Sequence, residues 1–451
     1  MENLYSLTVD LPEDVKRLTT FGDYDKALEL IEIYMERNIP KILKDRLNFE
    51  KDRMRRFKQD YIYSYEDALK LAKNKIKDFT KEELENMKNE RFADWAYING
   101  QVYFHKKFLD NIIQVNTELD NRIIDNVKTN KAGDVLDKTI DEITHNGDKK
   151  YYFRLKTGIK IKKEHAKIGE IIKVHIPIPR AAQQIKNIKI LKTSHEPKII
   201  APESHLQRTI YFEERLTGDD EFTVEYSYEN HVKYRELDRT IVSTDQPHFC
   251  TGEWPPHIVF SPFLVSLAEE IVGDEINPLI KARNIYNYIT QNIQYSYVRQ
   301  YAAIINAPEY AAYNLKGDCG IQAMLFITLC RIVGIPARWQ SGLYSNPHSI
   351  GCHDWAEFYI EPYGWLFADP SFGGGGYRRK DGQRWNFYFG NLDPFRMVAN
   401  SEFHYDFYPA KKYLRSDPYD NQIGEAEYLD RPIFDDEFDT IMEIVDTKEI
   451  K

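Results

Sequence analysis

The stretch from 314 to 342, NLKGDCGIQAMLFITLCRIVGIPARWQSG, limits the fold more than any other part of the chain. After Cys319 the residues are apolar on nearly every side of a helix until Val333. Gly334 then ends the helix and Pro336 prevents its continuation. A helix that is apolar all round has to be buried. The sequence therefore predicts a central helix over 319–333, with the other elements packed around it.

Cys319 lies at the first turn of this predicted helix, directly after Asp318, which suits the N-cap position. The positive end of the helix dipole and the unpaired N–H groups there favour a thiolate, which is the nucleophilic form of cysteine. The N–H of Cys319 is also a donor for an oxyanion. A cysteine within an apolar run, such as Cys330, usually serves packing. The position of Cys319 indicates a reactive cysteine instead.

A base and an acceptor that orients it follow in the next segments. His353 begins the predicted strand HDWAEFYI, and Asp369 ends the predicted strand GWLFADP. A tight turn at 362–364 would pair the two strands and bring these side chains together at one end. Taken singly, such a histidine is usually structural and an aspartate before proline is usually a turn residue. Together with Cys319 they fit the logic of a catalytic triad.

The segments KGDCGIQAMLFITLCRIVGIPARWQSG and HDWAEFYIEPYGWLFADPSFG resemble the transglutaminase-like core of the papain-fold cysteine enzymes. The shared pattern is a Gly-Asp-Cys helix start, a Gly-Ile-Pro-Ala-Arg strand entry, a His-x-Trp-x-Glu strand and a Gly-Trp strand ending in Asp. The resemblance covers about residues 255–372. It implies a thiol enzyme with Cys319, His353 and Asp369 as catalytic residues. It implies no cofactor, and no calcium dependence is carried over, because no calcium loop is visible.

Family members include protein crosslinkers, peptide:N-glycanases and bacterial proteins thought to be peptidases, and the fold does not choose among them. Our primary expectation is a cysteine-dependent hydrolase of amide or peptide bonds that forms a thioester on Cys319. An acyltransferase or crosslinker with the same triad is the first alternative. A catalytically inactive core that serves as a binding module is the second.

The family's oxyanion hole often adds an upstream aromatic or amide side chain, for which the candidates here are Tyr295, Tyr313 and Gln322. Trp355 is expected to support the strand rather than react. Cys352 is expected to pack, with a redox role as the lesser alternative. Asp354 is expected to be exposed, with tuning of the neighbouring His353 as the alternative.

The segment SFGGGGYRR, residues 371–379, lacks the Gly-Lys-Ser/Thr ending of a phosphate-binding loop. We expect it to be a flexible loop beside the active site, where Arg378 and Arg379 meet a substrate carboxylate. The sequence has neither Cys-x-x-Cys nor His-x-x-x-His spacing, so we expect no metal site.

The remaining chain predicts an α+β protein. Residues 1–135 show helical spacing, with Ser64 as an N-cap and a capping box at Thr80 and Glu83. Residues 150–240 alternate with period two, which indicates a small antiparallel β-sandwich. The papain-like core follows over 245–400. Residues 401–451 are expected to wrap the core and then fray.

Composition narrows the kind of partner. The 451 residues carry a formal net charge of -10, whereas a nucleic-acid binder would have a basic footprint. The start has no signal-peptide pattern, and no apolar run reaches about 18 residues. Four cysteines are too few and too irregular for a disulfide framework. We expect a cytoplasmic protein with reduced thiols that acts on a peptide or protein amide, with neither nucleic acid nor membrane as partner. Its oligomeric state is left open.

Overall fold

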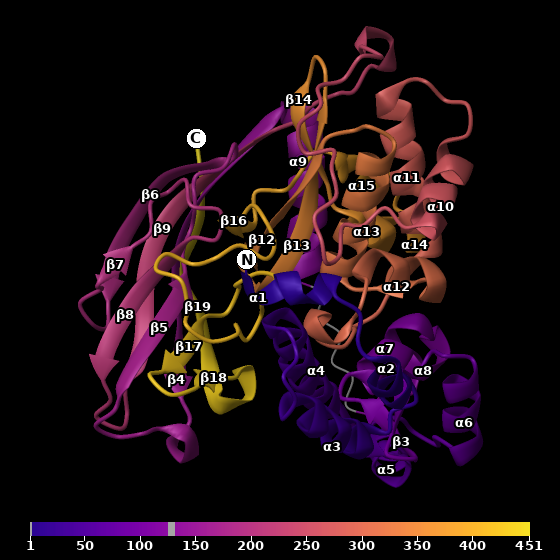
Figure 1. Ribbon diagram of the computed structural model, residues 1–451. Helices are drawn as coiled ribbons and strands as arrows, with labels where there is room; N and C mark the ends of the chain where they lie inside the picture. The colour runs from indigo at the N-terminus through magenta and orange to yellow at the C-terminus, as the bar shows by residue number, and fades with distance from the viewer. Residues whose placement is uncertain (1, 125–130) are drawn as a thin grey trace. The chain divides into compact units, whose positions relative to one another are not determined.

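The computed structural model describes residues 2–124 and 131–451, which divide into two compact units. The first unit contains residues 131–295 and 307–451, and the second contains residues 2–124 and 296–306 (Figure 1). The segment 296–306 therefore leaves the predicted core and belongs to the N-terminal unit. Within the described residues, none of the helices combines the length and apolar character needed to cross a membrane.

The N-terminal unit is mainly helical, as its sequence spacing predicts. Its helices are α1 (Glu2–Tyr5), α2 (Glu13–Thr20), α3 (Tyr24–Met35), α4 (Lys41–Asp60), α5 (Tyr65–Lys75), α6 (Lys81–Asn89), α7 (Phe108–Val115) and α8 (Thr117–Asn121). It also contains a small antiparallel sheet, in the order β1 (Tyr61–Ser64), β3 (Gln101–His105), β2 (Trp95–Ile98), which the helical prediction for this region missed. These strands are only four or five residues long, too short for a clear period-two pattern.

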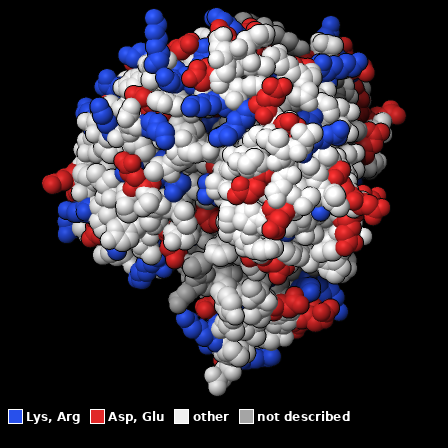
Figure 2. Space-filling model, turned by 90° about the horizontal axis from the view of Figure 1, so that it is seen from above, with Lys and Arg blue, Asp and Glu red and all other residues white. Residues whose placement is uncertain are grey.

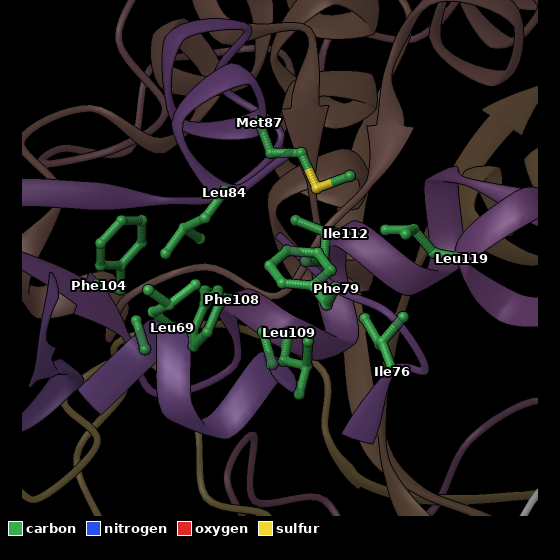
Figure 3. Packing of buried hydrophobic residues seen from close by; sticks show 13 residues of the cluster. Leu69, Ile76, Phe79, Leu84, Met87, Phe104, Phe108, Leu109, Ile112 and Leu119 are labelled. Carbon is green, nitrogen blue, oxygen red and sulfur yellow. The ribbon is translucent and has the colours of Figure 1, made fainter. Parts of the chain in front are cut away.

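Local capping in this unit follows the sequence. The Ser64 side chain accepts a hydrogen bond from the Asp67 N–H at the start of α5. Thr80 and Glu83 form the predicted capping box at the start of α6. Aromatic and aliphatic side chains fill the core between these helices and the small sheet (Figure 3), among them Leu69, Leu84, Phe104, Phe108 and Ile112.

The β-rich part of the first unit consists of two antiparallel sheets. Helix α9 (Lys131–Asn146) precedes them. One sheet has the order β18 (Pro432–Ile433), β17 (Glu425–Tyr428), β5 (Ile171–Pro177), β8 (Thr209–Arg215), β7 (Ile199–Ile200). The other has the order β19 (Phe438–Ile450), β4 (Asp148–Ile161), β9 (Glu221–Lys233), β6 (Ile185–Thr193). Phe212 of β8 contacts Phe222 of β9, with ring centroids 6.1 Å apart, so apolar side chains of the two sheets share a core.

The expectation that the chain frays at its end is wrong. Residues 438–450 form β19, which pairs with β4 along nearly its whole length. The alternation of apolar and charged residues in FDTIMEIVDTKEI suits an edge strand, whose outer side chains are charged. Strands β17, β18 and β19 therefore complete two sheets that begin more than 200 residues earlier in the chain.

The remaining part of this unit surrounds the predicted central helix. Its helices are α10 (Pro262–Val272), α11 (Pro278–Asn292), α12 (Ala307–Asn314), α13 (Cys319–Ile332), α14 (Pro370–Arg378) and α15 (Gly382–Phe387). Its sheet has the order β15 (Phe389–Gly390), β14 (Gly364–Ala368), β13 (Ser349–Ile360), β12 (Ala337–Asn346), β16 (Arg396–Asn400). A short parallel pair joins β10 (Gln294–Tyr295) to β11 (Lys316–Gly317). Figure 1 shows α10, α11, α13 and α14 grouped beside β13 and β14.

Helix α13 is buried as predicted. Ile321, Met324 and Phe326 have no exposed surface, and Phe326 packs edge-on against Phe358 of β13 at 5.6 Å. The helix therefore fixes the position of its own first residue, Cys319, relative to β13.

The expectation of a flexible loop at residues 371–379 is also wrong, because residues 370–378 form α14. Asp369 caps this helix by accepting a hydrogen bond from the Phe372 N–H, and Pro370 occupies its first position. The glycines permit close packing rather than flexibility. A Cβ on Gly373 would lie 1.7 Å from the hydroxyl oxygen of Tyr286 on α11.

Acidic and basic side chains both occur on the face shown in Figure 2, where acidic ones gather toward the right-hand margin and the left-hand part mixes both signs. This face therefore carries no continuous basic stripe.

Gly373→Ala should destabilise the fold by about 1–3 kcal/mol, because the added methyl group overpacks the contact with Tyr286. The free energy of unfolding in urea is the measurement. Gly375→Ala is the matched control, since nothing lies within 4 Å of its Cβ position and alanine favours the helix by about 1 kcal/mol. Equal effects of the two substitutions would contradict the packing account.

Candidate active site

Cys319 is the first residue of α13. The Asp318 side chain accepts a hydrogen bond from the Ile321 N–H at 3.1 Å, as expected of an N-cap. Among the described residues, the N–H groups of Cys319 and Gly320 have no hydrogen-bond acceptor. The thiol is partly exposed, whereas Cys330 in the same helix is fully buried. The helix start thus places two unused amide donors next to the cysteine side chain.

His353 of β13 and Asp369 after β14 lie together, as the strand pairing predicts. The last pair between these strands is Ala356 with Ala368, so Asp369 lies just past the end of the ladder. The Nε2 of His353 is 2.8 Å from the Oδ2 of Asp369. The ring also packs against Phe372 at 4.4 Å. Within the part of the chain that the structure describes, the Nδ1 of His353 has no hydrogen-bond partner, so this nitrogen is left to act as a base.

A buried arginine that the sequence did not suggest lies behind this pair. Nη1 of Arg396 on β16 lies 2.9 Å from the Oδ2 of Asp369, and Nη2 of Arg396 lies 2.6 Å from the Oδ2 of Asp393. Burial alone would raise the pKa of Asp369, but His353 and Arg396 outweigh it and hold the pKa well below its usual range. Burial, together with Arg396, lowers the pKa of His353 despite the opposing charge of Asp369. Both shifts favour a neutral imidazole beside a carboxylate.

The environment of the Cys319 sulfur differs from the prediction. The thiol donates a hydrogen bond to the Oδ2 of Asp354 at 3.4 Å, and among the described residues no hydrogen bond joins it to His353. Burial raises the pKa of Cys319, and the charges of Asp354 and Asp318 raise it further. Burial and these two carboxyl groups therefore favour the thiol and oppose the thiolate that the helix start favours.

Two further expectations on β13 are wrong. Asp354 is only 5% exposed, because the segment 401–424 covers it. Gln422 of this segment donates to the Oδ1 of Asp354 at 2.7 Å and to the carbonyl oxygen of His353 at 3.1 Å. Cys352, expected to pack, is exposed. Strand β13 is therefore buried at Asp354 and exposed at Cys352. The local sequence does not indicate this difference in exposure.

The three candidate oxyanion side chains have different positions. Tyr295 pairs with Gly317 in the parallel β10–β11 contact, two residues before the cysteine. Gln322 is fully buried and donates from Nε2 to the carbonyl oxygen of Gly317 at 2.8 Å, so it braces the helix start. Tyr313 is 61% exposed and stacks on Phe263. Of the three, Tyr295 and Gln322 bond to the segment that leads to Cys319, whereas the ring of Tyr313 stacks on Phe263.

Trp355 supports the strand, as expected. It is fully buried, donates from Nε1 to the Oε1 of Gln340 at 2.8 Å, and stacks on His353. Arg378 and Arg379 are exposed at the C-terminal end of α14, whose N-terminus is capped by Asp369. Since a helix rises about 1.5 Å per residue, the backbone positions of the two arginines lie roughly 13–15 Å from that cap.

Sequence reasoning missed Arg396, Gln422 and two carboxyl groups beside Asp354, the buried one of Asp420 and the partly buried one of Asp417. The only signal for them was the density of polar and aromatic residues after 380. Within residues 2–124 and 131–451, no group of three or more His, Cys, Asp or Glu side chains forms a candidate metal site.

Known proteins are similar to the part of the chain that contains Cys319, His353 and Asp369. The family model of the transglutaminase-like superfamily matches residues 265–370. An uncharacterized protein of Haemophilus influenzae is 25% identical over 178 residues, a match that covers 34% of this chain and 47% of that protein. This chain thus spans about half the length of the curated relative that it matches.

Three solved structures are similar to the chain. A candidate cysteine protease from Cytophaga hutchinsonii has a TM-score of 0.35 and 16% identity, and the match covers 66% of this chain and 98% of that one. The periplasmic domain of TgpA from Pseudomonas aeruginosa has a TM-score of 0.29 and 14% identity, and the match covers 55% of this chain and 95% of that one. A candidate protease from Parabacteroides distasonis has a TM-score of 0.23 and 11% identity, and the match covers 47% of this chain and 42% of that one.

The family match includes the whole of α13, β13 and β14, and so includes each side chain of the sequence-predicted triad. Residues 265–370 of this chain therefore form a transglutaminase-like superfamily domain.

Proposed function

We propose that the protein is a cysteine-dependent hydrolase of amide or peptide bonds, with Cys319, His353 and Asp369 as its catalytic residues. The observation that carries the proposal is the buried 2.8 Å contact between His353 and Asp369, which occupies Nε2 and leaves Nδ1 without a partner. A histidine oriented in this way by a carboxylate is the arrangement that nucleophilic catalysis requires.

In the proposed mechanism the neutral imidazole acts as a general base. Its Nδ1 takes the proton of the Cys319 thiol as the sulfur attacks the substrate carbonyl carbon. The free N–H groups of Cys319 and Gly320 stabilise the resulting oxyanion. The imidazolium then protonates the leaving amine, and the carbon–nitrogen bond breaks to leave a thioester. Water, activated by the same histidine, hydrolyses the thioester and restores the thiol.

Asp369 and Arg396 set the properties of the base. Asp369 stabilises the imidazolium that forms during the reaction, and Arg396 keeps Asp369 ionised and fixed.

Acyl transfer to an amine uses the same residues with a different final acceptor. Adding an amine acceptor to a turnover assay separates the two, since an enzyme that transfers acyl groups gives an amide product at the expense of acid.

The proposed enzyme acts on a peptide or protein in a reducing compartment such as the cytoplasm. All four cysteines are free thiols in the structure, and the nucleophile has to be reduced to act.

Cys319→Ala should reduce turnover of fluorogenic peptide amides to background, because the substitution removes the sulfur that forms the thioester. Cys330→Ala is the control, since this buried cysteine lies three turns along the same helix. A Cys319→Ala protein that retains turnover would refute the catalytic assignment and favour the binding-module alternative.

Asp369→Asn should lower kcat by about 100-fold or more, because asparagine neither fixes the required tautomer nor stabilises the imidazolium. Asparagine still caps α14, so the fold should be retained. Asp381→Asn, at the N-cap of α15, makes the same change without contact to His353 and should leave kcat unaltered. Similar rates for both variants would remove Asp369 from the triad.

The acid limb of the kcat/KM profile should lie below the usual histidine pKa of about 6.5, because burial lowers the pKa of His353. The base works only when neutral, so activity persists as the pH falls below about 6.5 and is lost as the pH passes through the lowered pKa. A profile of kcat/KM from pH 4 to pH 8 would measure this limb. A midpoint above 7 would contradict it.

A further inference from the structure

The sulfur of Cys319 has an ionisable neighbour that the triad does not use. The Oδ2 of Asp354 is 3.4 Å from the Cys319 Sγ, and Asp354 is nearly fully buried. A carboxylate in that position would oppose the formation of a thiolate, since two like charges would meet in a medium of low dielectric. The protonation state of Asp354 therefore decides whether it hinders or assists the nucleophile.

The groups around Asp354 are mostly acidic. Asp318, at the start of α13, faces it, and Asp417 and Asp420 approach it from the segment 401–424. The thiol of Cys352 lies next to this cluster on β13 itself. Asp420 is 3% exposed, and its Oδ2 has no hydrogen-bond donor among the described residues.

A counterion for this cluster is not evident in the described chain. Asp354, Asp417 and Asp420 form no ion pair with Lys, Arg or His there. Arg415 is the cation whose charge reaches Asp417 and Asp420, and its guanidinium contacts Glu425 at 2.9 Å and Gln207 at 2.6 Å. Carboxyl groups that adjoin one another in a largely buried cluster without a direct ion pair cannot all be ionised, so protons are shared among them.

The pKa values agree with this picture. Burial raises the pKa of Asp354 well above its usual range, and the charges of Asp420 and Asp318 raise it further. Burial and Asp420 raise the pKa of Asp417 to about 7.

The hydrogen bonds of Asp354 indicate which of its oxygens carries the proton. Oδ1 accepts the 2.7 Å hydrogen bond from the side-chain amide of Gln422 and is therefore an acceptor. A neutral carboxyl group has one such carbonyl oxygen and one hydroxyl. Oδ2 is the oxygen that accepts from the thiol while Cys319 keeps its proton. It is also the oxygen from which a neutral Asp354 can donate to the sulfur once that thiol proton has left, and Asp420 is another side chain that hydrogen-bonds to this carboxyl group.

We propose that Asp354 is a further catalytic residue, whose neutral carboxyl group donates a hydrogen bond from Oδ2 to the Cys319 sulfur as the thiolate forms. The inference rests on the proposed role of Cys319 as nucleophile. The thiol proton goes to Nδ1 of His353, the electron pair stays on sulfur, and the Asp354 proton stays on Oδ2 throughout. Once Asp354 ionises, its charge opposes the thiolate and Cys319 keeps its proton.

The reactivity of Cys319 should therefore pass through a maximum with pH. It rises as the thiolate forms, and it falls when the pH passes through the raised pKa of Asp354. The rate of alkylation by limiting iodoacetamide, measured from pH 5 to pH 10 on the full chain by mass spectrometry, reports this reactivity without any substrate. Cys250, which is exposed and remote from the carboxyl cluster in sequence, is the internal control and should react faster at each higher pH.

Three variants test the role of the carboxyl group. In Asp354→Asn the amide N–H replaces the hydroxyl as donor and cannot ionise, so the alkaline fall should disappear. Asp354→Leu removes the donor and should slow alkylation at neutral pH by about 10-fold or more, since hydrogen bonds to charged groups contribute about 1.5–3 kcal/mol. Asp420→Asn removes a charge that raises the pKa of Asp354, so the fall should move to lower pH.

A wild-type rate that climbs in parallel with that of Cys250, unchanged in Asp354→Asn, would overturn the proposal. If circular dichroism shows that Asp354→Asn does not fold, the test rests on Asp420→Asn. An alkylation profile of Cys319 that Asp420→Asn leaves at the same pH would then contradict the role of Asp354. A maximum that responds to these variants in a protein without turnover would support the role of Asp354 while refuting the proposed hydrolase. The two conclusions can thus fail separately.

Discussion

Burial of α13 is the constraint on which the rest of this unit depends. A helix with apolar residues on nearly every side is stable only when other elements cover all of it, and β13, α11, α12 and α14 do so. Covering the helix fixes its first residue as well as its middle. The cysteine is therefore held in place by about fourteen residues of packed helix behind it rather than by contacts of its own side chain.

The electrostatics of the site arise from the balance between burial and charge. The start of a helix favours a thiolate, yet burial and two carboxyl groups favour the thiol at Cys319. At Asp369 the nearby charges outweigh burial instead, because Arg396 and His353 favour the ionised carboxylate although the side chain is completely buried. The carboxyl group of Asp369, just past the end of β14, is favoured charged, and that of Asp354, on the neighbouring strand β13, is favoured neutral. Two acids with different roles can be obtained in this way from the same chemical group.

Much of the fold could be predicted from the sequence, because local patterns determine it. The apolar run specified α13, Thr80 and Glu83 specified a capping box, and the period-two segments specified the strands of 150–240. The pairing of His353 with Asp369 followed from a short hairpin. What escaped prediction depends on residues distant in sequence. Gln422 reaches Asp354 across 68 residues, and α14 was mistaken for a loop because its glycines serve contacts with α11 that no local pattern reveals. The hydrogen bond from the Cys319 thiol to Asp354 escaped prediction for the same reason, since it depends on a neighbour 35 residues away in the chain.

The return of residues 425–450 to the β-rich sheets has a consequence for biosynthesis. The ribosome delivers the strands of 148–233 first, then Cys319, His353 and Asp369, and only afterwards β17, β18 and β19. Strands β4 and β5 therefore wait with unpaired edges while the whole catalytic region is translated. Gln422 and Asp420 emerge just before the closing strands, so the environment of the nucleophile is completed in the same late stage of synthesis as the sheets. A nascent chain thus carries its cysteine for about a hundred residues of translation before Asp420 and Gln422, the side chains next to Asp354, are made.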